Sequence, residues 1–198
     1  FMGPGDGRPD FRNRMEHPVL VDMLIHTFDQ ARFLLGEKRA VSAYCQELNP
    51  PNSWYDHPAI ALCTFSFEDG SVLSLRGSWA TKCENTPSHG FWRVYCTDGT
   101  ACWDGAERVW VSRAQPVPSA GYFEEEGVRE DIPLSYAGRE DHVGCVEDML
   151  SALNRGQTMM TDCRNNIYSL EMVYACIRSA ETGRKCFLSS DAEVAAEE

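Results

Sequence analysis

The sequence predicts an α+β domain in which a large, open and mostly antiparallel β-sheet carries helices on one face. Three observations lead to this class. Strand-like runs follow one another without helices between them. Short turn sequences join these runs, as in hairpins. Helical patterns flank the strand region at both ends. Such a sheet usually leaves its other face to solvent or to a partner.

The first predicted element is a helix over residues 18–36, which begins at Pro18 and ends at Gly36. On a wheel of about 100° per residue, Asp22, His26 and Asp29 fall within about 60° of one another. Apolar side chains fill most of the remaining surface: Leu20, Met23, Leu24, Ile25, Phe28, Leu34 and Leu35. We therefore expect a largely buried helix whose ionisable side chains face a pocket.

Six strands are predicted next, over residues 40–48, 59–67, 71–82, 91–97, 100–103 and 108–112. Several of them alternate apolar and polar residues, which is typical of strands with one buried face. Turn-forming residues lie between them at Glu68–Gly70, Asp98–Gly99 and Asp104–Glu107. Because such short connections reverse the chain, neighbouring strands should be antiparallel.

The last third of the chain predicts two helices and a short strand. Residues 115–137 hold three prolines and the acidic run Glu124–Glu126, so we expect a loop there with at most one irregular strand. One helix covers residues 139–154, and a second begins at Asp162 as N-cap and ends before Gly183. The first of them gathers apolar side chains on one side: Val143, Val146, Met149, Leu150 and Leu153. Residues 185–188 are typical of a short strand.

Domain boundaries follow from these elements. We expect residues 18–188 to form one domain, residues 1–17 to be a linker or the remnant of an upstream region, and residues 189–198 to be an acidic tail. Because the chain begins with Phe1 rather than methionine, we expect it to be a fragment that starts within a longer protein.

Composition excludes several classes of function. A formal net charge of −12 argues against nucleic acid as a partner. No apolar run approaches the roughly 20 residues that span a bilayer, and the start lacks the features of a signal peptide. We expect a cytoplasmic protein with no membrane contact. The nine cysteines are odd in number, and five lie in apolar runs, which predicts buried free thiols: Cys45, Cys63, Cys96, Cys102 and Cys176.

Asp22 and His26 are the candidate catalytic residues. Their spacing of four residues puts them on adjacent helical turns, about 6 Å apart along the axis. Histidine can exchange a proton near neutral pH, and a nearby carboxylate can orient its ring or bind a substrate hydroxyl. The alternative is a core histidine whose hydrogen bonds a local carboxylate satisfies. The spacing alone favours neither.

Further candidates for substrate binding are Asp29 on the same helix and Trp54, Tyr55 and His57 in a loop. Aromatic rings in a loop can stack on a sugar or simply cap the sheet. The sequence holds no Cys-x-x-Cys, His-Glu-x-x-His, Gly-x-Ser-x-Gly or Gly-x-Gly-x-x-Gly. It therefore predicts no metal site, no serine nucleophile and no phosphate-binding loop.

The segment over residues 17–36 resembles the helix that opens the C-terminal domain of the glucose-fructose oxidoreductase/inositol dehydrogenase/MocA (Gfo/Idh/MocA) family, with its pattern Asp-x-x-x-His-x-x-Asp and a Leu-Gly end. Phe67–Val72, Thr97–Ala101 and Ser179–Lys185 are similar to that domain's hairpins and last helix. The resemblance implies a sheet of the glyceraldehyde-3-phosphate-dehydrogenase-like type, which binds substrate on its helix side. Its open face would pair with another copy in a homo-oligomer. We also expect oligomerisation from the residues, because tryptophans on the predicted strands give the sheet more apolar surface than its own helices can cover: Trp79, Trp92, Trp103 and Trp110.

The resemblance also implies an activity. In the family, an N-terminal Rossmann domain binds NAD or NADP, and an Asp and His pair of this kind helps to oxidise a hydroxyl of a sugar, polyol or cyclitol. The pair corresponds to Asp22 and His26. No residue of this chain corresponds to the glycine-rich fingerprint or to the catalytic lysine of a Glu-Lys-Pro motif, so we expect no cofactor-binding residue here and no catalysis by this chain alone. Glu16-His17-Pro18 stands where the family often has a glycine-rich stretch.

Two other functions stay open. The chain could be a stand-alone sugar-binding or scaffold domain of the same fold without catalysis. It could also belong to a metal-dependent lyase or isomerase that uses Asp22, His26 and a distant histidine.

Overall fold

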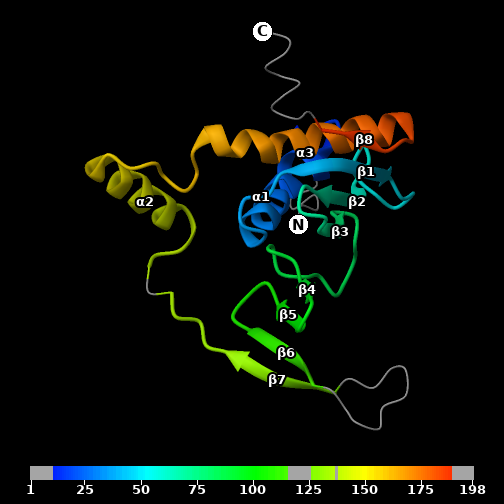
Figure 1. The fold of residues 1–198 in the computed structure, drawn as a ribbon. Helices are drawn as coiled ribbons and strands as arrows, with labels where there is room; N and C mark the ends of the chain where they lie inside the picture. The colour runs from blue at the N-terminus through cyan, green and yellow to red at the C-terminus, as the bar shows by residue number, and fades with distance from the viewer. Residues whose placement is uncertain (1–10, 116–125, 137, 189–198) are drawn as a thin grey trace. The chain divides into compact units, whose positions relative to one another are not determined.

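The structure, a computed structural model, describes residues 11–115, 126–136 and 138–188. The chain forms two compact units (Figure 1). One unit contains the residues up to Lys82 together with those from Cys145 onward, and the other contains Cys83–Gly144. The acidic tail, most of the expected N-terminal linker and two residues of the acidic run, Glu124 and Glu125, lie outside the described residues.

The first unit is built on a four-stranded sheet. Its strands are β1 (Ala40–Leu48), β2 (Ile60–Phe67), β3 (Val72–Ser78) and β8 (Cys186–Phe187), in the order β3-β2-β1-β8. All pairings are antiparallel. The turn between β2 and β3 is closed by Asp69, whose carboxylate accepts hydrogen bonds from the Ser71 N–H and hydroxyl.

Two helices cover one face of this sheet, α1 (Ile25–Leu34) and α3 (Cys163–Thr182). Helix α3 lies alongside β1 (Figure 1) and also contacts α1. Every second residue of β2 is buried beneath the helices, as the sequence alternation predicts. The rings of Phe28 on α1 and Phe65 on β2 meet edge to face, with centroids 4.9 Å apart. Both belong to one buried apolar cluster that includes Met172 of α3.

The first predicted helix differs from the expected regular one. Val19–Leu24 forms a π-helical turn, and α1 begins only at Ile25. The wider turn alters the side-chain spacing that a wheel of about 100° per residue assumes. The expected burial also holds for part of the helix only, because Phe33 and Leu34 are exposed. The helix ends before Gly36, whose φ of 71° is the left-handed conformation that glycine adopts readily.

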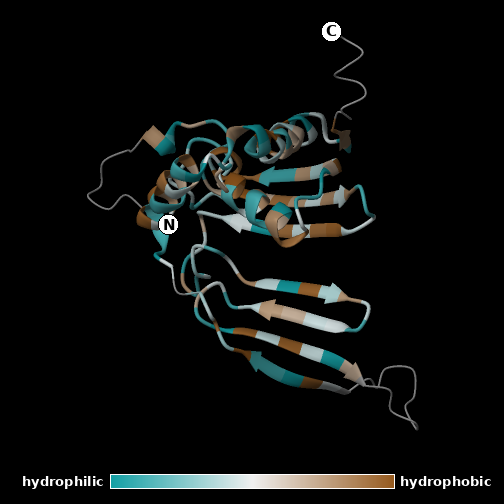
Figure 2. Ribbon diagram, turned by 60° about the vertical axis from the view of Figure 1, so that its left-hand side comes forward, coloured by the Kyte–Doolittle hydropathy of each residue, from teal (hydrophilic) through white to brown (hydrophobic). Residues whose placement is uncertain are grey.

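The second unit is a four-stranded antiparallel sheet of consecutive strands, β4 (Trp92–Cys96), β5 (Gly99–Trp103), β6 (Val109–Gln115) and β7 (Glu126–Ile132). Apolar residues form bands along these strands (Figure 2). The predicted α+β class with antiparallel strands is confirmed, but the strands form two sheets of four. Strand β7 is polar and lacks alternation, which is why its sequence predicted at most an irregular strand.

The structure also shows how far the expected burial holds for one helix, for the cysteines and for Trp79. Helix α2 (Asp141–Arg155) is present, yet its apolar side is exposed and Ala152 is its buried residue. All nine cysteines are free thiols, but Cys96 is exposed and not buried as expected. Trp79 is buried in the first unit and directly follows the last residue of β3, so it adds no exposed apolar surface to the sheet. No helix among the described residues is both long and apolar enough to cross a membrane.

Candidate functional site

Asp22 and His26 lie on either side of the change from π to α geometry. Asp22 is in the π-helical turn, and His26 is the second residue of α1 with an exposed side chain. The carboxylate of Asp22 accepts two hydrogen bonds from Arg12, with Nε at 2.7 Å from Oδ2 and Nη2 at 3.5 Å from Oδ1. A forked contact of this kind fixes the plane of a carboxylate. Asp22 is therefore oriented, while the imidazole of His26 faces solvent.

The short 3-10 turn that carries Arg12, Phe11–Asn13, also holds the aromatic loop. Asn13 Nδ2 donates to the carbonyl of Trp54 at 2.8 Å, and the Asp56 N–H donates to the carbonyl of Asn13 at 2.8 Å. The turn thus connects Asp22 to the loop that holds Trp54. The ring of Trp54 is exposed.

A second link joins the same loop to the helix through the core. Tyr55 is buried, and its ring lies 5.6 Å from that of Trp79. The Trp79 indole N–H donates to the Met23 sulfur at 2.9 Å. Tyr55 is therefore placed as a support beneath the loop, whereas Trp54 is accessible to a ligand. His57, the remaining predicted residue of the loop, is half-buried.

Just before the π-helical turn, a hydrogen bond to Glu47 holds His17 in a strained backbone conformation. His17 has a φ of 50°, which is uncommon outside glycine. Its Nδ1 lies 2.5 Å from Oε2 of Glu47 on β1, and its Nε2 lies 3.9 Å from Oε1 of Glu181 on α3. Burial raises the pKa of the Glu47 carboxyl above its ordinary value, while the hydrogen bond and charge of His17 oppose that shift.

Asp29 has different surroundings from Asp22. Its Oδ1 accepts a hydrogen bond from the Ser169 hydroxyl at 2.7 Å and lies 3.8 Å from Nη1 of Arg32. Arg32 is itself buried and also donates to Asn165 and Glu37. Arg12 and Asn13 therefore link Asp22 to the Trp54 loop, and His26 follows Asp22 by four residues in the same helical segment. Asp29 instead takes part in the contact between α1 and α3.

Dinucleotide binding in the Rossmann manner requires a parallel strand–helix–strand unit with a glycine-rich turn. Every pairing between the described strands is antiparallel. The sequence also lacks the glycine-rich pattern. The described part of the chain therefore does not fit the cofactor's dinucleotide moiety, and we assign it no residue for that role.

Sequence reasoning missed Arg12, Arg32 and the proximity of Cys45, Cys63 and Cys176. Arg12 lies in a segment without periodicity, and its pairing with Asp22 depends on a reversal of the chain. The three cysteines are far apart in sequence and match no ligand spacing, yet their sulfur atoms all lie within 4.8 Å of one another. An arginine at position 32 of an otherwise apolar helix was the one signal that could have indicated a buried ion-pair network.

Comparison with known proteins covers the whole described domain. Residues 11–188 match the family model for "Oxidoreductase family, C-terminal alpha/beta domain". An uncharacterised protein, y4oX, from Sinorhizobium fredii is 25% identical over 175 residues, which are 88% of this chain and 48% of that protein.

Solved structures show the same fold. An oxidoreductase from Agrobacterium radiobacter, in complex with NAD+, L-tartaric acid and magnesium, superposes with a TM-score of 0.71 at 23% identity, over 92% of this chain and 52% of that one. The WlbA dehydrogenase from Bordetella pertussis, in complex with NADH and UDP-GlcNAcA, superposes with a TM-score of 0.62 at 17% identity, over 87% and 46%. The chain thus spans about half the length of the proteins it matches.

Proposed function

Because the chain belongs to this oxidoreductase family as its C-terminal alpha/beta domain, we propose that it binds the substrate of an NAD(P)-dependent dehydrogenase acting on a sugar, polyol or cyclitol hydroxyl. One observation carries the proposal. An exposed histidine and an oriented carboxylate lie on consecutive turns, beside a loop with an exposed indole ring. The ligands named for the A. radiobacter and B. pertussis proteins are also rich in hydroxyl groups.

Each residue has a role that its surroundings support. His26 accepts the proton of the hydroxyl that is oxidised, because it is the solvent-facing base of the group. Asp22, fixed by Arg12, accepts a hydrogen bond from a substrate hydroxyl or from the imidazole. Trp54 offers the apolar face of its ring to a sugar. NAD(P), which takes the hydride, would come from a nucleotide-binding domain outside these 198 residues.

Calorimetry against a panel of sugars, polyols and cyclitols, with and without NAD(H), tests the binding role. We expect His26→Gln to weaken binding of the best ligand and His142→Gln, an exposed histidine on α2, to leave it unchanged. In a full-length protein that joins this domain to a nucleotide-binding domain, His26→Gln should lower kcat by about 10²–10⁴-fold. Wild-type kcat in that variant would refute the assignment.

The same titrations distinguish this proposal from the alternative function, a sugar-binding or scaffold domain without catalysis. That function predicts ligand affinity that does not change with NAD(H), and no turnover in any full-length context. A dehydrogenase domain predicts that cofactor and substrate bind cooperatively once a nucleotide-binding domain is present, because both then contact the same site.

We also propose that the uncovered face of the first sheet pairs two copies of the chain. The face is shallow and mixes polar with apolar side chains: Tyr44, Gln46, Leu62, Thr64, Ser74 and Arg76. Tyr44→Arg should convert a dimer to monomers in light scattering, because it places a charge within the contact. Tyr136→Arg, an exposed tyrosine in the other unit, is the matched control. A monomeric wild-type chain at high concentration would refute this pairing.

A further inference from the structure

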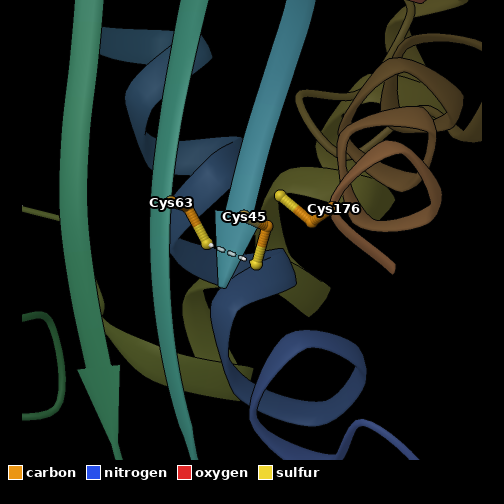
Figure 3. A group of neighbouring side chains, drawn as sticks. All are labelled: Cys45, Cys63 and Cys176. Carbon is orange, nitrogen blue, oxygen red and sulfur yellow. Dashed lines mark hydrogen bonds between the residues drawn. The ribbon is translucent and has the colours of Figure 1, made fainter. Parts of the chain in front are cut away.

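Three cysteines from three different elements converge inside the first unit: Cys45 on β1, Cys63 on β2 and Cys176 on α3 (Figure 3). The Cys45 and Cys63 sulfurs are 3.6 Å apart, and all three lie within 4.8 Å of one another. None of the three side chains is more than 2% exposed. Cysteine thiolates are the ligands that soft metal ions prefer.

The backbone holds these sulfurs in place. Cys45 and Cys63 are direct partners in the register of β1 and β2. The Cys45 N–H donates to the Ser179 hydroxyl on α3, so it points away from β2. The pair is therefore not joined by backbone hydrogen bonds, and in such pairs the side chains lie closer together. Ser179 also donates to the carbonyl of Arg184, which fixes the part of α3 that follows Cys176.

The separations match those of a bound ion. Three sulfurs around an ion at about 2.3 Å would be about 4 Å apart. The Cys45 and Cys63 sulfurs are 3.6 Å apart, and no sulfur is more than 4.8 Å from another. Among the described residues, no histidine, carboxylate or fourth cysteine completes the group. Zinc sites are almost always four-coordinate, so three sulfurs without another donor favour a soft monovalent ion.

We propose that Cys45, Cys63 and Cys176 form a buried three-sulfur binding site for one ion of the Cu(I) type, which joins the sheet to α3. The three sulfurs come from β1, β2 and α3, so one ion bound by all of them would link the sheet to the helix. Because a ligating cysteine is a thiolate, binding of the ion would release protons from these thiols.

The test uses the full chain with its accessible thiols removed, as a parent variant in which serine replaces Cys83, Cys96, Cys145, Cys163 and Cys186. The reduced parent is titrated with Cu(I) in the absence of oxygen, against a chromophoric Cu(I) chelator. We expect one ion per chain and an X-ray absorption spectrum with three sulfur neighbours. We also expect the thermal midpoint to rise by about 5–10 °C at about a hundredfold excess of free ion over Kd.

Cys176→Ala in this parent should weaken Cu(I) binding at least about 100-fold, while Cys102→Ala, a buried cysteine of the other unit, should not change it. Circular dichroism shows whether each variant folds. If Cys176→Ala does not fold, the number of sulfur neighbours in the X-ray absorption spectrum of the parent still tests the site. The proposal is overturned by a parent that loses Cu(I) entirely to the chelator, by equal affinity in Cys176→Ala, or by tighter binding of Zn(II) with a nitrogen or oxygen neighbour.

Discussion

At the scale of single residues, Glu47 makes folding sensitive to pH. Its carboxyl is buried, and its pKa is raised above the ordinary glutamate value of about 4.3. The folded chain therefore holds this proton more tightly than the unfolded chain. The stabilisation that follows from the raised pKa of Glu47 is fully present at a pH below the pKa of this carboxyl in the unfolded chain. It is lost as pH rises through the pKa of the carboxyl in the folded chain.

We accordingly expect Glu47→Gln to change the pH dependence of unfolding. The free energy of unfolding of the variant relative to wild type should increase as pH rises from about 4.3 through the raised pKa, because glutamine carries no charge to bury. Chemical denaturation at several pH values measures it. Glu181→Gln, the more exposed partner of His17, serves as control. A difference between Glu47→Gln and wild type that stays constant with pH would contradict the prediction.

Arg12 is expected to affect ligand binding more than stability. Its ion pair with Asp22 is partly exposed, and such pairs contribute about 1 kcal/mol or less to folding. Arg12→Ala should therefore lower the free energy of unfolding by at most about 1 kcal/mol. It should weaken binding of the best sugar ligand about fivefold or more, because Asp22 loses its fixed orientation. Calorimetry and denaturation of the same sample measure both, and unchanged affinity would argue against a positioning role.

At the scale of elements, the contact between α1 and α3 depends on Arg32. Its side chain is buried and donates to Asn165, Ser169 and Glu37. Arg32→Met should lower the free energy of unfolding by about 3 kcal/mol, because it leaves polar partners without their donor. Arg164→Met, which removes an exposed guanidinium at the start of α3, should have little effect. Equal losses of stability in the two variants would exclude a special contribution of Arg32.

The π-helical turn packs against β3 at Gly77, where the Leu24 side chain lies close to the strand backbone. A Cβ on Gly77 would lie 2.8 Å from Cδ2 of Leu24. Gly77→Val should therefore lower the free energy of unfolding by about 1–3 kcal/mol. Because the clash is with Leu24, Leu24→Ala should offset part of the loss, and a double-mutant cycle would show coupling. Strict additivity of the two changes would indicate that the clash is relieved elsewhere.

At the scale of the whole molecule, the two units differ in how much apolar side chain they bury. The first contains a cluster that includes Phe28, Phe65 and Met172, whereas Cys102 is the one buried apolar side chain among the described residues of the second. Local opening costs less where few apolar contacts are lost. We expect amides of β4–β7 to exchange hydrogen at least about 100-fold faster than those of β1 and β2. Equal protection in the two sheets would show a common unfolding unit.

Much of the fold could be predicted from the sequence because its patterns are local. β1 was predicted over its observed length, and the other strands differ by a few residues at their ends. Alternation of apolar and polar residues and turn-forming sequences depend only on neighbouring residues, so both can be recognised without knowledge of the tertiary structure. β7 was not firmly predicted, because it is a strand through its pairing with β6 and not through its own composition.

The candidate site also has a part that the sequence predicted and a part that required the tertiary structure. The sequence alone identified the helical segment that carries Asp22 and His26, because its apolar pattern and its boundaries at Pro18 and Gly36 are local signals. Only the tertiary structure decided that the turn around Asp22 is π-helical, that Arg12 holds its carboxylate and that Asp29 contacts α3. It alone brought Cys45, Cys63 and Cys176 together. Contacts between residues far apart in sequence depend on how elements pack, and no short-range pattern records that packing.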